Sequence, residues 1–440
     1  MHDVIVIGGG PTGSSIATFL AQRGLSVKLF EKEVFPRDHV GESLLPLNYN
    51  LFKELGVLEE MEQRFYRKPG VRFLNIDGSV QTTWCFKRVI KGPDHLSFHV
   101  FRADFDKMLL MNSAKHGVEA HEGSKVTRAE LDDPDTVTIH VRNGEAETTH
   151  RARFLVDCSG QLTFLAKQLK DKEPFEGLNR MALNSHWVDV PFNKIMEEGT
   201  LQILHLGGEK LGWIWVIPIS EGRASIGVVL SADYAKQQRV AMQAAGEKDW
   251  QMALYKQELF SSPVITDLLK GARLFMPIML NGDYSYYTKQ KYGLNYAIVG
   301  DASAFLDPIF ASGVYIGIKS AQLVAQGIRS QLNGSTNGAM TLDKAYEHIA
   351  GAYVMVEKLI RLFYNPESIS FAEVGKAIDV DYKKFEAAYT ILHFLLAGDF
   401  FENYARYIEF IDLLQDTRQL ENFKHRIHSE RFELLDEVCT

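Results

Sequence analysis

A glycine-rich turn near the N-terminus places the strongest constraint on what this chain can fold into. The apolar run Val4–Ile7 is typical of a parallel strand buried on both faces, and the motif G-G-G-P-T-G follows it directly. In such a motif Gly8 permits the tight turn, Gly10 lets the backbone approach a pyrophosphate, and Gly13 allows close helix–strand packing. Glu31 ends the next strand, about 20 residues on, where its carboxylate can accept hydrogen bonds from ribose hydroxyls. The sequence therefore predicts a dinucleotide-binding unit.

A second segment of the same kind follows an apolar strand that ends at Val299. It begins with Gly300-Asp301-Ala302, continues through Asp307-Pro308, and leads into a helix at Ala311–Val314. Asp301 is placed to bind ribityl hydroxyls. The turn at Gly313 presents backbone N–H groups at a helix N-terminus, which attracts an anion or electron density.

Charge and composition exclude several classes of protein. The net charge of −8 and the isoelectric point near 6.0 give no support for a nucleic-acid partner. The N-terminus opens directly into a strand without a basic leader, and no uninterrupted apolar stretch reaches the roughly 18 residues of a spanning helix. Cysteine and histidine spacings typical of a metal site are missing from the sequence. We therefore expect a cytoplasmic protein with no membrane, nucleic-acid or metal partner.

The chain of 440 residues is longer than one ordinary domain. The pattern of apolar and polar residues changes several times along it. It predicts an α/β fold in which a Rossmann-like dinucleotide-binding domain is interleaved with an antiparallel β-sheet substrate domain, followed by a helical C-terminal region. The expected nucleotide-binding domain takes 1–70, 100–180 and 270–330. The β-rich domain takes 71–99 and 181–269, and the helical region takes 331–440. Within 48–64, Gly56 is expected to break an amphipathic helix in two.

The spacing of the two glycine segments resembles the FAD-dependent aromatic hydroxylases and their relatives. Arg102, in V-F-R-A-D-F-D, matches the arginine of that family's middle motif, which contacts the cofactor, and Asp157–Gly160 resembles its second strand-end segment. An NAD dehydrogenase is not expected to carry the segment that begins at Gly300. The resemblance therefore implies FAD as the dinucleotide.

Three further segments resemble the flavin-dependent halogenases within that group. W-I-W-V-I-P at 213–218 reproduces the family's W-x-W-x-I-P signature, which lines the wall between flavin and substrate. The segment 36–46 looks like the family's stretch beneath the isoalloxazine ring. K-P-G-V-R-F at 68–73 resembles the strand start that carries its catalytic lysine. Read without the resemblance, these are a buried aromatic strand, a loop before a helix and a surface lysine.

The resemblance implies a mechanism and a set of site residues. Halide attacks a C4a-hydroperoxyflavin, and Lys68 captures the hypohalous acid released, because a desolvated ammonium combines a point charge with a tunable pKa. The predicted cofactor-binding residues are Gly8, Gly10, Thr12, Gly13, Glu31, Lys32, Arg37, Glu42, Ser43, Arg102, Asp301, Pro308, Gly313 and Val314. The predicted halide ligands are the backbone N–H groups of Ser312 and Gly313, and the predicted substrate tunnel is lined by Trp213, Trp215, Pro218 and Phe310.

The residue type at position 310 differs from that of one branch of the family, and this difference limits the expected class of substrate. Tryptophan halogenases carry a glutamate at this position, whereas halogenases of phenols and of carrier-bound pyrroles do not, because electron-rich rings need less assistance. We therefore expect a pyrrole or phenol substrate, with the pyrrole presented on an acyl or peptidyl carrier protein.

The resemblance also implies the reactants and leaves alternatives open. The expected cofactors are FAD, as FADH2 from a separate flavin reductase, O2, and chloride or bromide. The alternatives are an aromatic hydroxylase or a prenyl-chain reductase of the same fold, and a flavin-binding protein without turnover. The last of these leaves the 213–218 segment and Lys68 unexplained. The oligomeric state stays open, a dimer included.

Overall fold

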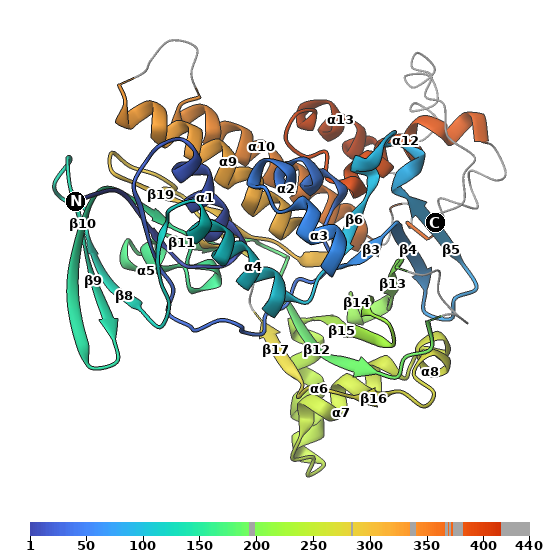
Figure 1. The fold of residues 1–440 in the computed structure, drawn as a ribbon. Helices are drawn as coiled ribbons and strands as arrows, with labels where there is room; N and C mark the ends of the chain where they lie inside the picture. The colour runs from blue at the N-terminus through green and yellow to red at the C-terminus, as the bar shows by residue number, and fades with distance from the viewer. Residues whose placement is uncertain are drawn as a thin grey trace.

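The computed structural model describes residues 1–192, 199–282, 285–334, 340–365, 368, 371–372 and 382–414. Two large sheets and a layer of C-terminal helices make up this part of the chain (Figure 1). The predicted α/β fold class is confirmed. Within the described ranges, no helix has both the length and the apolar character that crossing a membrane requires.

The first sheet carries the predicted nucleotide-binding unit. Its strand order is β7-β2-β1-β10-β9-β8, with β19 paired to β10. β1 is parallel to both β2 and β10, and β10 is parallel to β19. The C-terminal ends of strands from the start, the middle and the later part of the chain therefore lie side by side. The strands are β1 His2–Ile7, β2 Val27–Phe30, β7 Glu119–His121, β8 Lys125–Glu130, β9 Val137–Asn143, β10 Ala146–Asp157 and β19 Tyr296–Ile298.

Helices cover one face of the first sheet. Val4 and Val6 of β1 share a core with Ile16 and Phe19 of α1. Ile5 and Ile7, on the opposite face, pack with residues of β8 and β9. The helices near this sheet are α1 Pro11–Gln22, α4 Arg102–Lys115, α5 Phe164–Gln168 and α9 Ser312–Leu332. This alternation explains why the run of β1 is apolar throughout.

The second sheet is built from β16-β12-β15-β14-β13-β4-β5, with β17 paired to β12. Along β14, Trp213 and Trp215 face the core shared with the first sheet, while Ile214 and Val216 face a separate core with α7 and α8. Its strands are β4 Gly70–Asn75, β5 Gln81–Cys85, β12 Arg180–Val188, β13 Leu201–His205, β14 Trp213–Ser220, β15 Arg223–Ser231, β16 Arg273–Leu274 and β17 Met279–Gly282.

The smaller elements complete the connections. β3 Tyr66–Lys68 pairs with β6 Ser97–His99, and β11 Lys172–Pro174, β18 Tyr286–Thr288 and β20 Ala304–Phe305 form a three-stranded sheet. Gly56 has φ 76° at the end of α2 Tyr49–Leu55, ahead of α3 Leu58–Arg64, so the predicted break is confirmed. The helices α6 Ala232–Ala244, α7 Trp250–Leu259 and α8 Pro263–Leu268 lie within a stretch for which β structure was expected, and they cover the outer face of the second sheet.

Of the C-terminal helices, α10 Leu342–Tyr364 packs against α9, α13 Tyr404–Leu414 packs against α10, and α12 Tyr382–Ala397 lies beside β5 (Figure 1). Met355, Val356, Leu359 and Ile360 of α10 are buried in the same core as Trp213 and Trp215. The C-terminal region is therefore part of the body that surrounds the site residues.

Candidate functional site

The glycine motif is packed so closely that two of its positions admit no side chain. A Cβ atom on Gly8, which has φ +99°, would lie 2.3 Å from the carbonyl oxygen of Cys158. A Cβ on Gly13 would lie 1.9 Å from the carbonyl oxygen of Gly8. At Gly10 the nearest atom is instead Nη2 of Arg37, 3.3 Å from the ideal Cβ position. The N-terminus of α1 therefore carries bare backbone next to a guanidinium, an arrangement suited to a pyrophosphate.

Glu31 is fixed at the end of β2. Its Oε2 accepts a hydrogen bond from the Gly9 N–H at 2.7 Å, and its Oε1 accepts one from the Glu33 N–H at 2.9 Å. The side chain is buried, so its orientation is set by these two amides. Lys32, in contrast, is exposed and pairs with Glu33 at 3.0 Å.

Thr12 joins the two glycine segments. A Cβ on Gly300 would lie 2.6 Å from Thr12 Oγ1, and one on Gly317 in α9 would lie 2.3 Å from the same atom. The hydroxyl of Thr12 is thus packed into the contact between α1 and α9. The structure brings the two predicted segments side by side, and glycine at 300 and 317 makes this approach possible.

Asp301 and Arg102 face the same region as Gly313. The ideal Cβ position of Gly313 is 3.9 Å from Asp301 Oδ1. Burial raises the pKa of the Asp301 carboxyl to about 6, although the charge of Arg102 opposes this rise. Arg102 makes a two-pronged ion pair with Asp106, with Nε–Oδ1 at 2.7 Å and Nη2–Oδ2 at 2.8 Å. Its Nη1 also donates to the Val40 carbonyl at 2.6 Å and so holds the segment 36–46.

The segment 36–46 is tied to both sheets. Arg37 lies 3.2 Å from Asp106 on α4. Oε1 of buried Glu42 lies 3.2 Å from Nε2 of His186 on β12, and Nη2 of Arg223 on β15 lies 2.9 Å from Nδ1 of the same ring. Because a guanidinium only donates, Nδ1 of His186 accepts and Nε2 carries the proton shared with Glu42. Burial opposes ionisation of Glu42, but the hydrogen bond from His186 holds the pKa of this carboxyl below its ordinary value.

His186 and Arg223 were not predicted as site residues. The available signal was weak, because each lies in a strand that carries other polar residues as well.

Lys68 ends β3 and is only 1% exposed. Its Nζ donates to the Leu44 carbonyl at 2.8 Å, and it lies 5.4 Å from the centre of the Phe86 ring. Burial lowers its pKa to about 7, and no carboxylate pairs with it among the described residues. This is a desolvated lysine rather than the surface lysine of the alternative interpretation.

Buried polar groups surround Lys68. Ser97 lies opposite it across the β3–β6 pair, and Ser43 bridges to His99 on β6. Nε2 of His99 bonds the Gly199 carbonyl at 2.8 Å, and burial followed by the charge of Lys68 lowers its pKa to about 3. In the described part of the chain the Oγ atoms of Ser43 and Ser97 and Nδ1 of His99 have no hydrogen-bond partner. The neighbourhood of Lys68 is therefore neutral, buried and able to hydrogen-bond a ligand.

The tryptophan strand is anchored to the second glycine segment. Trp213 Nε1 donates to the Tyr364 hydroxyl at 2.9 Å, and that hydroxyl donates to Asp307 Oδ2, also at 2.9 Å. Trp215 Nε1 donates to Ser225 Oγ at 3.2 Å, and Pro218 lies where the β14–β15 register shifts. Tyr364, at the end of α10, was not predicted, because it lies beyond every segment of the family resemblance.

Phe310 belongs to an aromatic cluster with Phe73 of β4, Phe363 of α10 and Phe371, whose ring centres lie between 5.5 and 6.5 Å from its own. Asp307 Oδ1 accepts from the Ile309 N–H at 3.1 Å, which fixes the turn Pro308–Phe310. Ala311 then has φ 53°, and α9 begins at buried Ser312, followed by Gly313 and Val314. The amides for which a halide was predicted are therefore the first of this 21-residue helix, where backbone N–H groups have no partner within the helix.

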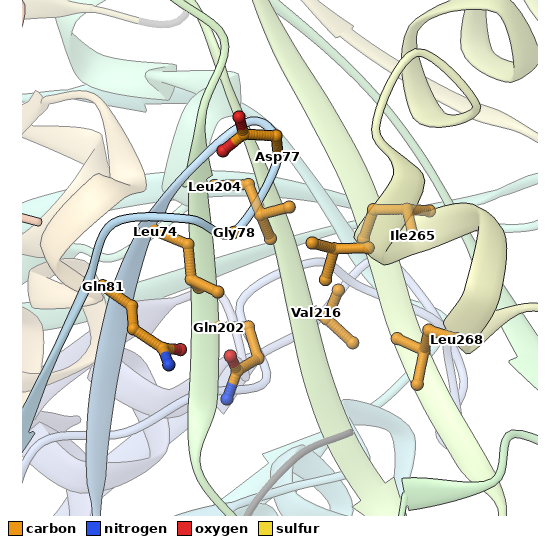
Figure 2. A pocket seen from close by; sticks show the side chains of 10 residues that line it. Leu74, Asp77, Gly78, Gln81, Gln202, Leu204, Val216, Ile265 and Leu268 are labelled. Carbon is orange, nitrogen blue, oxygen red and sulfur yellow. The ribbon is translucent and has the colours of Figure 1, made fainter. Parts of the chain in front are cut away.

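A cavity of about 200 Å³ lies on the other face of the second sheet, between the β4–β5 hairpin, β13, β14 and α8 (Figure 2). Val216 and Leu204 line it from the sheet, and Ile265 and Leu268 line it from α8. Because side chains alternate along β14, this cavity is separated by the sheet from Trp213 and Trp215. Of the predicted substrate residues, Trp213, Trp215 and Phe310 belong to the core shared with the first sheet. By the same alternation Pro218 falls on the face of Ile214 and Val216, away from the two tryptophans.

The residues around the two glycine segments fit an FAD. Gly10 offers a space that a side chain would fill, Glu31 offers a fixed carboxylate, and Asp301 lies beside the start of α9. No group of three or more His, Cys, Asp or Glu side chains suited to a metal ion occurs in the described ranges.

Comparison with known proteins agrees with this geometry. Residues 1–355 match the FAD binding domain family. A tryptophan 2-halogenase of Chondromyces crocatus is 33% identical over 367 residues, covering 82% of this chain and 67% of that protein. A 1H-pyrrole-2-carbonyl-[peptidyl-carrier protein] brominase of Pseudoalteromonas luteoviolacea is 32% identical, and the match covers 82% of this chain and 86% of that protein. The solved structure of the flavin-dependent brominase Bmp2 is 27% identical with a TM-score of 0.78, covering 93% of this chain and 99% of that one.

Proposed function

This chain belongs to the flavin-dependent halogenases of the FAD binding domain family, and from that membership we propose that it halogenates an electron-rich aromatic ring. The proposed substrate is a pyrrole carried on an acyl or peptidyl carrier protein, with a phenol as the second choice. FADH2 comes from a separate flavin reductase, O2 is the oxidant, and chloride or bromide supplies the halogen.

Buried Lys68 is the observation that carries this proposal. An ammonium with no carboxylate partner in the described structure and a pKa of about 7 is half protonated near neutral pH. Such a group can accept the electrophilic halogen on its amine form, or donate a hydrogen bond to hypohalous acid on its ammonium form. Ser97, Ser43 and His99 surround it without a competing negative charge.

The residues that would hold the flavin follow from the site. The first amides of α1 and Arg37 bind the pyrophosphate, Glu31 binds the ribose, and Asp301 binds the ribityl chain. Arg102 holds the segment 36–46 through the Val40 carbonyl. When bound, the reduced flavin supplies the activation of O2 from which the electrophilic halogen species arises. The amides of Ser312 and Gly313 hold the halide at the positive end of α9.

The substrate class is supported by Phe310 and by two relatives. At the position where tryptophan halogenases carry a glutamate that assists attack on a less reactive ring, this chain has Phe310, whose ring packs against Phe73 and Phe363. Relatives named as a pyrrole-2-carbonyl carrier-protein chlorinase, from Pseudomonas fluorescens, and a brominase of the same kind are 30% and 32% identical.

The proposal is tested by mass spectrometry of a pyrrolyl-loaded carrier protein after incubation with the enzyme, FADH2, O2 and both halides. We expect halogenated pyrrole from the wild type. Lys68→Ala should oxidise FADH2 at the wild-type rate but yield no halogenated product, and Lys68→Arg should not restore it. Lys289→Ala, which removes an exposed lysine paired with Glu173, is the matched control and should halogenate normally. Normal halogenation by folded Lys68→Ala would contradict the role of Lys68, and consumption of NADH by the pure protein would favour a hydroxylase.

A further inference from the structure

One buried side chain on the second sheet lacks any partner for either of its polar atoms. Asn184 lies in the middle of β12 and is fully buried. Within the described residues, neither its Oδ1 nor its Nδ2 has a hydrogen-bond partner. More than nine-tenths of buried polar groups in native proteins are paired, so two orphan atoms in one carboxamide point to a partner that is not part of this chain.

The strand neighbours of Asn184 cannot supply that partner. On one side it lies opposite Gly227 of β15, which has no side chain, and on the other opposite Met279 of β17. The space of a Gly227 side chain is filled by the Trp215 ring, which would lie 2.2 Å from a Cβ there. The indole N–H of Trp215 is already donated to Ser225. The cross-strand neighbours of the carboxamide are therefore apolar and leave both of its polar atoms unpaired.

The face on which Asn184 lies is that of the candidate site. Side chains alternate along a strand, so Asn184 shares its face with Arg180, Ala182 and His186. Ala182 belongs to the same core as Trp213 and Trp215. His186, about 7 Å along the strand, bonds Glu42 of the segment 36–46.

Arg180 lies on the same face of β12, at the opposite end from His186. It lies about 13 Å from Asn184 along the strand, and its guanidinium lies 4.2 Å from the centre of the Tyr364 ring. The hydroxyl of Tyr364 bonds Asp307 of the second glycine segment. Asn184 thus occupies the stretch of β12 between His186, which contacts the segment 36–46, and Arg180, which lies on Tyr364 next to the second glycine segment.

We propose that the Asn184 carboxamide binds the edge of a planar ring that presents an N–H and a C=O side by side. A carboxamide offers one donor and one acceptor in a single plane, and it pairs with such an edge through two parallel hydrogen bonds. The pyrimidine ring of flavin carries this edge, and so does a pyrrole with a 2-acyl group. The assignment to a 2-acyl pyrrole rests on the proposed function, whereas the assignment to flavin requires only flavin binding.

The test compares two asparagine-to-leucine substitutions. Asn184→Leu removes two unpaired polar atoms, so it should not lower the melting temperature of the flavin-free protein. Asn112→Leu is the matched control: Asn112 is also buried, but its Nδ2 donates to the Leu55 carbonyl at 3.0 Å. The control should lower the melting temperature and leave the FAD dissociation constant of the folded protein unchanged.

Two binding measurements identify the ligand. A rise of ten-fold or more in the dissociation constant of FAD for Asn184→Leu, measured by fluorescence titration, assigns the edge to flavin. An unchanged FAD constant with a ten-fold rise in KM for pyrrolyl-loaded carrier protein assigns it to the substrate. If both constants stay at wild-type values, the proposal is wrong. If the wild type does not halogenate pyrroles, the FAD titration alone decides, and an unchanged constant overturns the assignment. Asn184→Ala carries the same comparison if the leucine variant does not fold.

Discussion

Replacing Lys68 with methionine should make the flavin-free protein more stable at pH 7. Burial lowers the pKa of Lys68 from 10.5 to about 7. At about 1.4 kcal/mol for each pKa unit, this difference corresponds to about 5 kcal/mol of folding free energy, of which about 4 kcal/mol applies at pH 7. Methionine keeps the unbranched stem and cannot be charged. It leaves the Leu44 carbonyl without its donor, at a cost of about 1–3 kcal/mol. The expected net gain is therefore about 1–3 kcal/mol.

The sign of the pH dependence gives a second check. Unfolded lysine still binds a proton between pH 7 and pH 10.5, whereas Lys68 in the folded protein has released it, so wild-type stability rises with pH across this range. The methionine variant lacks this contribution, and its advantage should shrink as the pH rises from 7 toward 10.5. Urea unfolding of both flavin-free proteins at pH 7 and pH 9, followed by circular dichroism, measures the difference. Lys289→Met, at an exposed site, should change stability by less than about 0.5 kcal/mol. A methionine variant less stable than wild type at pH 7 would refute the desolvation argument.

Three further predictions concern the cofactor, the halide and the C-terminal helix. Gly10→Val should fold, because only the end of the Arg37 side chain lies near the new Cβ, but a spectrophotometric titration should find no FAD binding; a full complement of flavin would show that the pyrophosphate lies elsewhere. Crystals soaked in bromide should give an anomalous peak beside the amides of Ser312 and Gly313, and a peak remote from residues 311–314 would contradict the halide site. Tyr364→Phe removes the acceptor of the Trp213 indole and a donor to Asp307, so it should destabilise the protein by about 1–3 kcal/mol in a urea titration. Unchanged stability would mean that the two bonds contribute nothing.

Local sequence was enough to predict the parts of the site that depend on backbone geometry. The close approaches at Gly8 and Gly13 and the turn at Gly56 each follow from a conformation or a packing distance that only glycine allows. The fold class followed from the same signals together with the alternation of apolar residues.

Contacts between side chains far apart in the chain could not be predicted in this way. The Glu42–His186 pair joins residues 144 positions apart, and the Trp213–Tyr364 bond joins residues 151 apart. Nothing in either segment specifies its partner, because the contact exists only once both sheets and α10 are assembled. The helices α6 to α8 are different, since Ser231, Asp249 and Ser262 each accept a backbone hydrogen bond at a helix start. These N-cap residues indicate helix starts in the sequence itself, within the stretch for which β structure was predicted.

The packing of Thr12 against Gly300 and Gly317 also constrains the order in which the protein can fold during synthesis. α1 and β1 leave the ribosome early, yet the helix that covers α1 and the strand that completes the sheet beside β10 are translated only after residue 295. Until then, the side of α1 that packs against α9 has no cover, and the turn at Gly10 lacks the opposite half of its ligand cradle. Contacts of such long range slow folding and leave apolar surface open to association with other chains. Expression yield of this protein should therefore depend on chaperones that hold the emerging N-terminal half until the last third of the chain arrives.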